Sequence, residues 1–257
     1  MSAPTELKHF NLAALGQIPE KLRMLPQAIT WVAMTDADHE IKKMWLIFAV
    51  GKSSLLELWA LSPQGIPPVM KPVTKHFRAA DYEDVDACKR AFEQEALRLN
   101  AEGYNIYIVM NPISESFQGK SAGDADISHR ELLLIDIDRA VKKVEPANDA
   151  EVEAARKVAD AIKAFLEERG WSDPIRVMSG NGHHLYYVLA DTPNDEESKR
   201  GNQQFLLTLA QRFDTDLVKV DTVVFNASRI TKVPGTIARK GLESKDRPYR
   251  MAVLHEA

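Results

Sequence analysis

The amino-acid sequence predicts an α+β fold in which helices pack on a mixed β-sheet. Strand-like and helix-like stretches alternate along most of the 257 residues, which is the pattern of such folds. The strand-like stretches are short apolar runs, and the helix-like stretches repeat apolar residues at spacings of three and four. The dipeptide Asn181-Gly182 lies between two strand-like runs and is a strong hairpin signal, so part of the sheet is expected to be antiparallel.

The first half of the chain is predicted to contain three strands and one helix. The apolar strand-like runs are Trp45–Val50, Leu55–Leu61 and Tyr104–Met110. Residues 51–54, Gly-Lys-Ser-Ser, should join the first two runs as a hairpin. An amphipathic helix is expected to begin with Asp81 as its N-cap and to end at Gly103. Residues 111–129 are rich in Gly, Ser and Asp and predict a long exposed loop.

The second half repeats the alternation more clearly. The apolar run Leu132–Asp138 predicts a buried strand. A capping box of Asn148 and Glu151 should begin a helix that Gly170 closes, and a further helix should run from Asp195 to Phe213. The remaining strand-like runs are Pro174–Met178, His184–Leu189, Val218–Phe225 and Tyr249–Leu254.

Composition excludes several classes of protein. A single cysteine, Cys88, rules out a disulfide framework and a Cys-based zinc site. The apolar runs are too short to cross a bilayer and the N-terminus does not resemble a signal peptide, so a cytoplasmic protein without membrane partners is expected. The net charge of −4 argues against nucleic-acid binding over the whole surface. Residues 226–257 nevertheless carry seven Lys and Arg against three acids, which predicts a local basic patch for phosphates.

Two acids end the strand Leu132–Asp138. Side chains alternate along a strand, so Asp136 and Asp138 should share one face while Ile137 enters the core. Carboxylates this close repel each other unless something neutralises them, and oxygen ligands favour Mg²⁺ or Mn²⁺. The alternative is a strand that ends in a polar turn, and this short pattern does not decide between the two.

The turn that follows Met178 reads Ser179-Gly180-Asn181-Gly182 and leads into His183 and His184. Two glycines let the backbone approach a ligand closely and leave N–H groups available to an anion, and Ser179 and Asn181 add side-chain donors. The two histidines should face opposite sides of the strand, so only one of them can enter a site. A plain hairpin with two solvated histidines explains the pattern equally well.

Further polar groups follow near the C-terminus. Asp221 is a third acid in a strand-like setting, although by itself it is better explained as a surface aspartate. Arg229, Lys232 and Lys240 surround the turn Pro234-Gly235-Thr236 and are suited to phosphate contacts. The alternative is a solvated basic rim.

In this order the motifs resemble the archaeo-eukaryotic primase superfamily, and within it the primase-polymerases of plasmids, phages and other mobile elements. The resemblance covers roughly residues 55–255. It rests on Asp-x-Asp, Ser-Gly-x-Gly-x-His, an apolar residue before Asp221, and Asn-x-x-Arg followed by Pro-Gly-Thr. It implies a single catalytic core over residues 1–257, in which an N-terminal α/β module, 1–128, packs against an RRM-like catalytic module, 129–257.

The resemblance also implies an activity, template-directed nucleotidyl transfer that makes or extends primers on DNA. Two ions of Mg²⁺ or Mn²⁺ would be held by Asp136, Asp138 and Asp221. The triphosphate of an incoming NTP or dNTP would be held by Ser179, Gly180, Asn181, Gly182, His184, Arg229 and Lys240, and histidine and arginine would neutralise its charge. Template and primer DNA are the implied partners, and a replicative helicase is a further one.

Three other functions compete with this interpretation. A rolling-circle relaxase needs two histidines on one metal, whereas the adjacent His183 and His184 should diverge on a strand. A nucleic-acid-binding replication accessory module without catalysis could keep the same fold, although all three expected acids are present. A Toprim-type enzyme also uses Asp-x-Asp, but it does not explain the glycine turn before His184.

Overall fold

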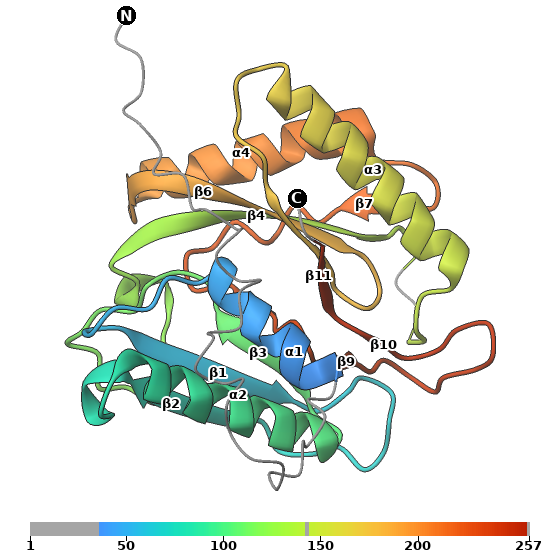
Figure 1. Ribbon diagram of the computed structural model, residues 1–257. Coiled ribbons are helices and arrows are strands. Elements are labelled where there is room, and N and C mark those ends of the chain that lie inside the picture. The colour runs from blue at the N-terminus through green and yellow to red at the C-terminus, as the bar shows by residue number, and fades with distance from the viewer. Residues whose placement is uncertain (1–35, 142–143, 256–257) are drawn as a thin grey trace, which may run out of the picture. The chain divides into compact units, whose positions relative to one another are not determined.

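The computed structural model describes residues 36–141 and 144–255, which belong to one unit by their internal contacts (Figure 1). It is a mixed α+β structure with two main antiparallel sheets, which confirms the predicted fold class. The start of the predicted N-terminal module, residues 1–35, lies outside the described residues. No helix in the described ranges is both long and apolar enough to cross a membrane.

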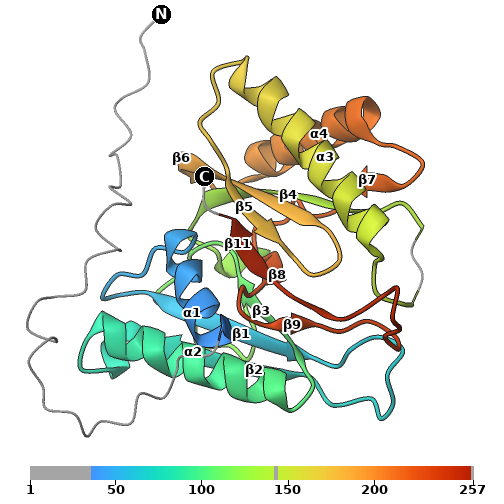
Figure 2. The ribbon, with the colours of Figure 1, turned by 45° about the vertical axis from the view of Figure 1, so that its right-hand side comes forward.

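The first sheet has four strands in the order β2-β1-β3-β8. They are β1 (Leu55–Leu61), β2 (Val73–Arg78), β3 (Asn105–Val109) and β8 (Ile230–Lys232). Helix α2 (Val85–Ala101) contacts β1, β2 and β3, and α1 (Asp36–Lys42) packs against α2 (Figures 1 and 2). Because β8 comes from the second half of the chain, a boundary at residue 128 does not separate the two sheets.

The expected hairpin at residues 51–54 is wrong, because Trp45–Val50 is not a strand. Residues Lys43–Leu46 form a 3₁₀ turn directly after α1. Met44, Ile47 and Phe48 are all buried there, and Trp45 donates a hydrogen bond to Glu93 of α2 at 2.6 Å. Tertiary packing of a helical turn therefore buries this apolar run, and it overrides the strand propensity of its residues.

The true partner of β1 is β2, which the sequence pattern missed. This strand lies at the edge of the sheet, and its central residues Lys75 and His76 are exposed. Edge strands are often polar because charged side chains discourage pairing with other chains. Helix α2 was predicted correctly except for its cap: Asp84, not Asp81, accepts the hydrogen bond from the Ala87 amide at 2.6 Å.

The second sheet has five strands in the order β11-β5-β6-β4-β7. Its elements are β4 (His129–Arg139), α3 (Asp149–Glu167), β5 (Ile175–Met178), β6 (His183–Pro193), α4 (Glu196–Phe213), β7 (Val218–Val220) and β11 (Val253–His255). From β4 to β7 the chain runs βαββαβ with β4 and β6 at the centre, which is the ferredoxin-like arrangement of RRM modules. The predicted RRM-like topology is therefore present, with β11 added at one edge.

Several predicted local signals are present in this sheet. Asn148 and Glu151 form the capping box of α3, and β5 and β6 form the hairpin predicted from Asn181-Gly182. The predicted strand Val218–Phe225 ends early, at Val220, where the chain turns away. The predicted strand Tyr249–Leu254 is divided between β11 and β10 (Arg250–Met251), which pairs with β9 (Ile237–Ala238).

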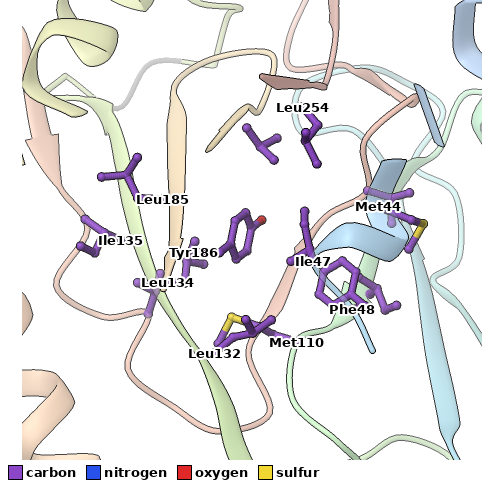
Figure 3. Packing of buried hydrophobic residues seen from close by; sticks show 14 of the residues in the cluster. Met44, Ile47, Phe48, Met110, Leu132, Leu134, Ile135, Leu185, Tyr186 and Leu254 are labelled. Carbon is purple, nitrogen blue, oxygen red and sulfur yellow. The ribbon is translucent and has the colours of Figure 1, made fainter. Parts of the chain in front are cut away.

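The two faces of the second sheet have different neighbours. Helix α3 contacts β4 and β6 on one face, where Ile135 and Leu185 lie. Leu132, Leu134 and Tyr186 lie on the other face, toward Met110, Ile47 and Phe48 (Figure 3). Because side chains alternate along a strand, Asp136 and Asp138 continue the row of Leu132 and Leu134 on the face away from α3.

The segment 111–128 is less exposed than the sequence suggested. Ile113, Phe117 and Ile127 are buried in a small separate cluster with Leu55, Val109 and Ala227. Asn111 anchors the segment, since its side-chain oxygen accepts hydrogen bonds from the amides of Glu131 and Leu132, both at 3.0 Å. A loop rich in small polar residues can still be held in place by a few apolar ones.

Candidate active site

Asp136 and Asp138 lie near the end of β4 on the face away from α3. Both are half-buried, whereas Ile137 between them is fully buried, as the predicted alternation requires. The side chain of Asp136 keeps 25% of its surface exposed. Asp138 accepts a hydrogen bond from the Arg139 amide at 2.9 Å through Oδ1. The two carboxylates are thus placed side by side with access to solvent.

Asp221 is brought to this pair by the pairing of β7 with β4. The register opposes Ile137 to Val220, and the Asp221 amide donates to the Asp136 carbonyl at 2.7 Å. Pairing therefore continues one position beyond β7 and sets Asp221 opposite Asp136. Its Oδ1 accepts a hydrogen bond from the Val223 amide at 3.0 Å, which fixes the carboxylate within a tight turn. Acids 85 residues apart in sequence thus adjoin.

The glycines of the turn between β5 and β6 are required by close packing. A Cβ on Gly182 would lie 2.2 Å from the Ile137 carbonyl oxygen and 3.2 Å from the Asp138 Cα. Gly180 has a φ of 100°, and a Cβ there would lie 2.4 Å from the Ala238 Cβ. Such backbone conformations and contacts favour glycine. The turn therefore packs directly against the backbone that carries Asp138.

The two other polar residues of the turn have different surroundings. The Asn181 side-chain oxygen accepts a hydrogen bond from the Ala147 amide at 2.8 Å, so Asn181 ties the turn to the segment before α3. Ser179 closes the turn, since its amide donates to the Gly182 carbonyl at 2.9 Å, and its side chain is half-buried. The Asn181 oxygen thus has a structural partner, which the sequence alone did not indicate.

His184 lies beside the acids and His183 does not. His184 is opposite Asp136 in the register of β4 and β6, and its Nε2 is 3.5 Å from Asp136 Oδ1. Its Nδ1 is 3.0 Å from the Tyr186 hydroxyl, which in turn contacts Thr231 Oγ1 at 2.5 Å. The His183 ring faces the other way and stacks on His255, with ring centres 5.8 Å apart.

Burial keeps His184 neutral. Its pKa is lowered to about 3, first by burial and then by the charges of His183 and Lys232. The expectation of a cationic histidine that neutralises a triphosphate therefore does not hold for the protein without a ligand. A neutral imidazole can still donate or accept one hydrogen bond in the site. The opposite orientations of the two histidines also leave no shared metal position of the kind a relaxase uses.

Two cations in the second half of the chain were not among the residues expected to hold the triphosphate. Lys232 on β8 pairs with Tyr107 on β3, is buried, and donates to the Ile237 carbonyl at 3.2 Å. Burial and, to a smaller extent, the neighbouring charge of Arg239 lower its pKa to about 7. Burial also lowers the pKa of Arg239, and its Nη1 is buried without a hydrogen-bond partner among residues 36–141 and 144–255.

Electrostatic effects link these cations to the predicted site. The charge of Lys232 contributes to the low pKa of His184. Burial raises the pKa of Tyr107 to about 12, and the charge of Asp136 contributes to the rise. Asp136, His184, Tyr107 and Lys232 therefore share one neighbourhood. The sequence indicated only that Lys232 belongs to a basic stretch. It did not predict that Lys232 is buried, because that burial depends on how β8 joins the first sheet.

The other basic residues of the C-terminal stretch have no described contact with the three acids. Arg229 donates a hydrogen bond to the Val223 carbonyl, in the turn that Asp221 begins. Lys240 is half-buried just after β9, and no described contact joins its side chain to the acids. Arg247 pairs with Glu151 at 2.7 Å and Arg250 with Asp149 at 2.5 Å. Part of the basic excess in residues 226–257 is thus neutralised within the fold.

The three acids suit a divalent metal by their chemistry, but they are not yet gathered around one point. Within the described ranges, no group of three His, Cys, Asp or Glu side chains is arranged to hold a metal ion. Asp136, Asp138 and Asp221 offer only carboxylate oxygens, which are the donors that Mg²⁺ and Mn²⁺ prefer. The backbones of Asp136 and Asp221 are joined by a hydrogen bond, and Asp138 shares the face of Asp136 on β4. The residues present therefore fit such a metal.

Comparison with known proteins gives structural neighbours only. No known family model matches the chain, and no curated protein matches its sequence. The structure is similar to the AEP domain of the cyanophage S-2L primase-polymerase, with a TM-score of 0.47 and 14% identity over 85% of this chain and 89% of that one. It is also similar to the polymerase domain of Mycobacterium tuberculosis ligase D, solved in complex with DNA, with a TM-score of 0.46 and 16% identity over 85% and 81%.

Proposed function

We propose that this chain is a template-directed nucleotidyltransferase, a DNA primase-polymerase that makes or extends primers with two Mg²⁺ or Mn²⁺ ions. One observation carries the proposal: Asp136, Asp138 and Asp221 adjoin on paired strands next to a glycine turn. These acids and this turn are the motifs that resemble those of primase-polymerases, and their proximity supports the proposal. Template and primer DNA, NTPs or dNTPs, a replicative helicase and a plasmid or phage origin follow from the sequence resemblance.

The acids would hold the metal ions. Bound between three carboxylates, such ions activate the primer 3′-hydroxyl and neutralise charge on the leaving pyrophosphate. The fold of this chain would hold the carboxylates in position for the metal ions. The amide of Asp221 is bonded to the carbonyl of Asp136, and the Val223 amide orients the Asp221 carboxylate. Strand pairing therefore sets the spacing of the metal ligands before any substrate arrives.

The nucleotide would lie between the glycine turn and the buried cations. The turn packs directly against the Asp138 backbone, so a phosphate bound by the N–H groups of the turn would lie beside the acids. Lys232 is buried and Arg239 half-buried, neither forms an ion pair with a carboxylate among the described residues, and an anion would offset the cost of their burial. His184, neutral and held by Tyr186, would position the triphosphate through a hydrogen bond.

Extension of a labelled primer on a DNA template, with Mg²⁺ or Mn²⁺ and nucleotides, tests this proposal. The double variant Asp136→Ala/Asp138→Ala should lose incorporation while its circular dichroism spectrum stays unchanged. The double variant Glu83→Ala/Asp86→Ala also removes two acids, both exposed, and should keep full activity. Incorporation by the Asp136→Ala/Asp138→Ala protein would overturn the enzymatic assignment.

A second candidate function is favoured by one observation: within the described ranges, no three side chains are already arranged to hold a metal ion. It is a nucleic-acid-binding replication accessory module that has the fold without the catalysis. The same experiment separates the two. An accessory module would bind primed DNA but incorporate no nucleotide in either metal, whereas the proposed enzyme does both.

A further inference from the structure

A cavity of about 580 Å³ lies away from the acids. It is lined by residues from three segments, 48–56, 108–116 and 128–131, so it adjoins the beginning of β4, whereas Asp136 is near the end. Ligand sites in proteins usually measure about 300–1,000 Å³, so its size suits a small organic molecule. None of the residues discussed above for the metal ions or the triphosphate lines it.

The lining combines an apolar floor with a polar rim. Phe48, Leu56 and Met110 are buried and supply the floor. On the rim, Ser128 Oγ is 2.9 Å from His129 Nδ1, and His129 Nε2 is 3.1 Å from Glu131 Oε1. These three lining residues form a connected row of polar groups, and such a row can meet the edge of a planar ring.

The charge of the lining excludes some ligands. No Lys or Arg is among the residues that line the cavity, whereas Glu115 and Glu131 are. A phosphate would therefore meet carboxylates without a countercharge, which is unfavourable. Carboxylates only accept hydrogen bonds, while serine and neutral histidine both donate and accept. The cavity thus disfavours anions and favours a ligand with at least one N–H group to donate.

We propose that this cavity binds an uncharged nucleobase that carries an exocyclic amino group, as adenine, cytosine and guanine do. A carboxylate is the usual acceptor for the amino group of cytosine. The base ring would rest against Phe48 and Met110, with its amino edge toward Glu131. Thymine offers acceptors and a methyl group at the corresponding edge, so it would bind more weakly.

The base could belong to a free nucleoside or to an unpaired nucleotide in a strand. The cavity borders the face of the second sheet that carries the acids, because Met110 lies beside Leu132 (Figure 3). Leu132 is four residues before Asp136, or roughly 13 Å along a strand. A strand bound near the acids could therefore reach the cavity. Binding of a base does not depend on the proposed catalysis, and the experiment keeps the two apart.

Calorimetric titration of the full chain with cytidine, adenosine and thymidine tests the proposal. Cytidine and adenosine should bind saturably, and thymidine about tenfold more weakly, since a good base contact is worth roughly 1–3 kcal/mol. Glu131→Gln is nearly isosteric and should abolish this preference. Asp138→Asn, in the proposed active site, should leave it unchanged. If Glu131→Gln does not fold, His129→Gln at the same rim provides the comparison.

Fluorescence of 2-aminopurine distinguishes the two sources of the base. The free riboside and a single-stranded oligonucleotide with one 2-aminopurine are each titrated, with cytidine as competitor. A cytidine-sensitive change with the riboside supports a nucleoside site, and a change with the oligonucleotide alone supports a base from a strand. Absence of saturable binding by every probe at millimolar concentration would overturn the proposal. Equal binding of cytidine and thymidine, unaffected by Glu131→Gln, would also overturn it.

Discussion

Replacement of Gly182 by alanine probes how the glycine turn supports the acids. The added Cβ would lie 2.2 Å from the Ile137 carbonyl oxygen, whereas real Cβ atoms essentially never approach closer than 3.0 Å. The backbone must therefore yield by about 0.8 Å. That shift falls on the peptide that joins Ile137 to Asp138, because no flexible side chain lies in the way.

Two effects should follow from this shift. Overpacking typically costs about 1–3 kcal/mol, so the free energy of unfolding should fall by that amount. Nucleotide incorporation should fall further, to about one hundredth, because a displacement near 1 Å at a reacting group can cost about 10²-fold. Urea unfolding and single-nucleotide primer extension measure the two quantities on the same preparation.

Gly201→Ala is the matched control. Gly201 lies in α4, and a Cβ there would meet nothing within 4 Å. This change should stabilise the protein by about 0.5–1 kcal/mol, since alanine is the better helix former, and should leave activity intact. If Gly182→Ala behaves like Gly201→Ala in both assays, the close contact between the turn and Asp138 is not real.

Three further predictions concern the buried ionisable groups. His184→Ala should lower kcat/KM by up to about tenfold through a lost neutral hydrogen bond, while His183→Ala changes it little; equal losses would refute the assigned orientation. Lys232→Met should leave the unfolding free energy at pH 7 unchanged or raised, since it removes a buried charge, yet reduce incorporation by at least about tenfold; retained activity would remove Lys232 from the site. Burial lowers the pKa of His183 to about 4. The unfolded chain, with a histidine pKa near 6.5, then binds more protons, so stability should fall below pH 6.5 by up to about 1.4 kcal/mol per pH unit. His183→Gln should flatten this dependence in urea unfolding, and an identical pH profile would contradict it.

Local sequence signals predicted the elements that carry most of the site. Asn148 and Glu151 mark the start of α3, and Asn181-Gly182 marks the hairpin, because caps and tight turns depend on neighbouring residues. The apolar run before Asp136 likewise identified β4 and the shared face of its two acids. These features need no knowledge of distant parts of the chain.

Features that depend on long-range pairing were predicted less well. Trp45 lies in a helical turn and donates a hydrogen bond to Glu93, which is 48 residues away in the sequence. The burial of Lys232 depends on its pairing with Tyr107, and the position of Asp221 on the pairing of β7 with β4. For Asp221 the family resemblance supplied what the local pattern could not, since its own surroundings looked like those of a surface aspartate.

Single-nucleotide incorporation by Asp221→Asn tests the central claim most directly, because only the fold brings this acid to Asp136. Asp216→Asn, which alters an exposed acid just before β7, is the control. With Mg²⁺, Asp221→Asn should reduce the incorporation rate by at least about 100-fold, since even a group that only supports a metal ligand is worth about 10–100-fold. Asp216→Asn should stay within about twofold of the unaltered protein, as surface changes usually do. Equal rates for the two variants would contradict a three-carboxylate metal site.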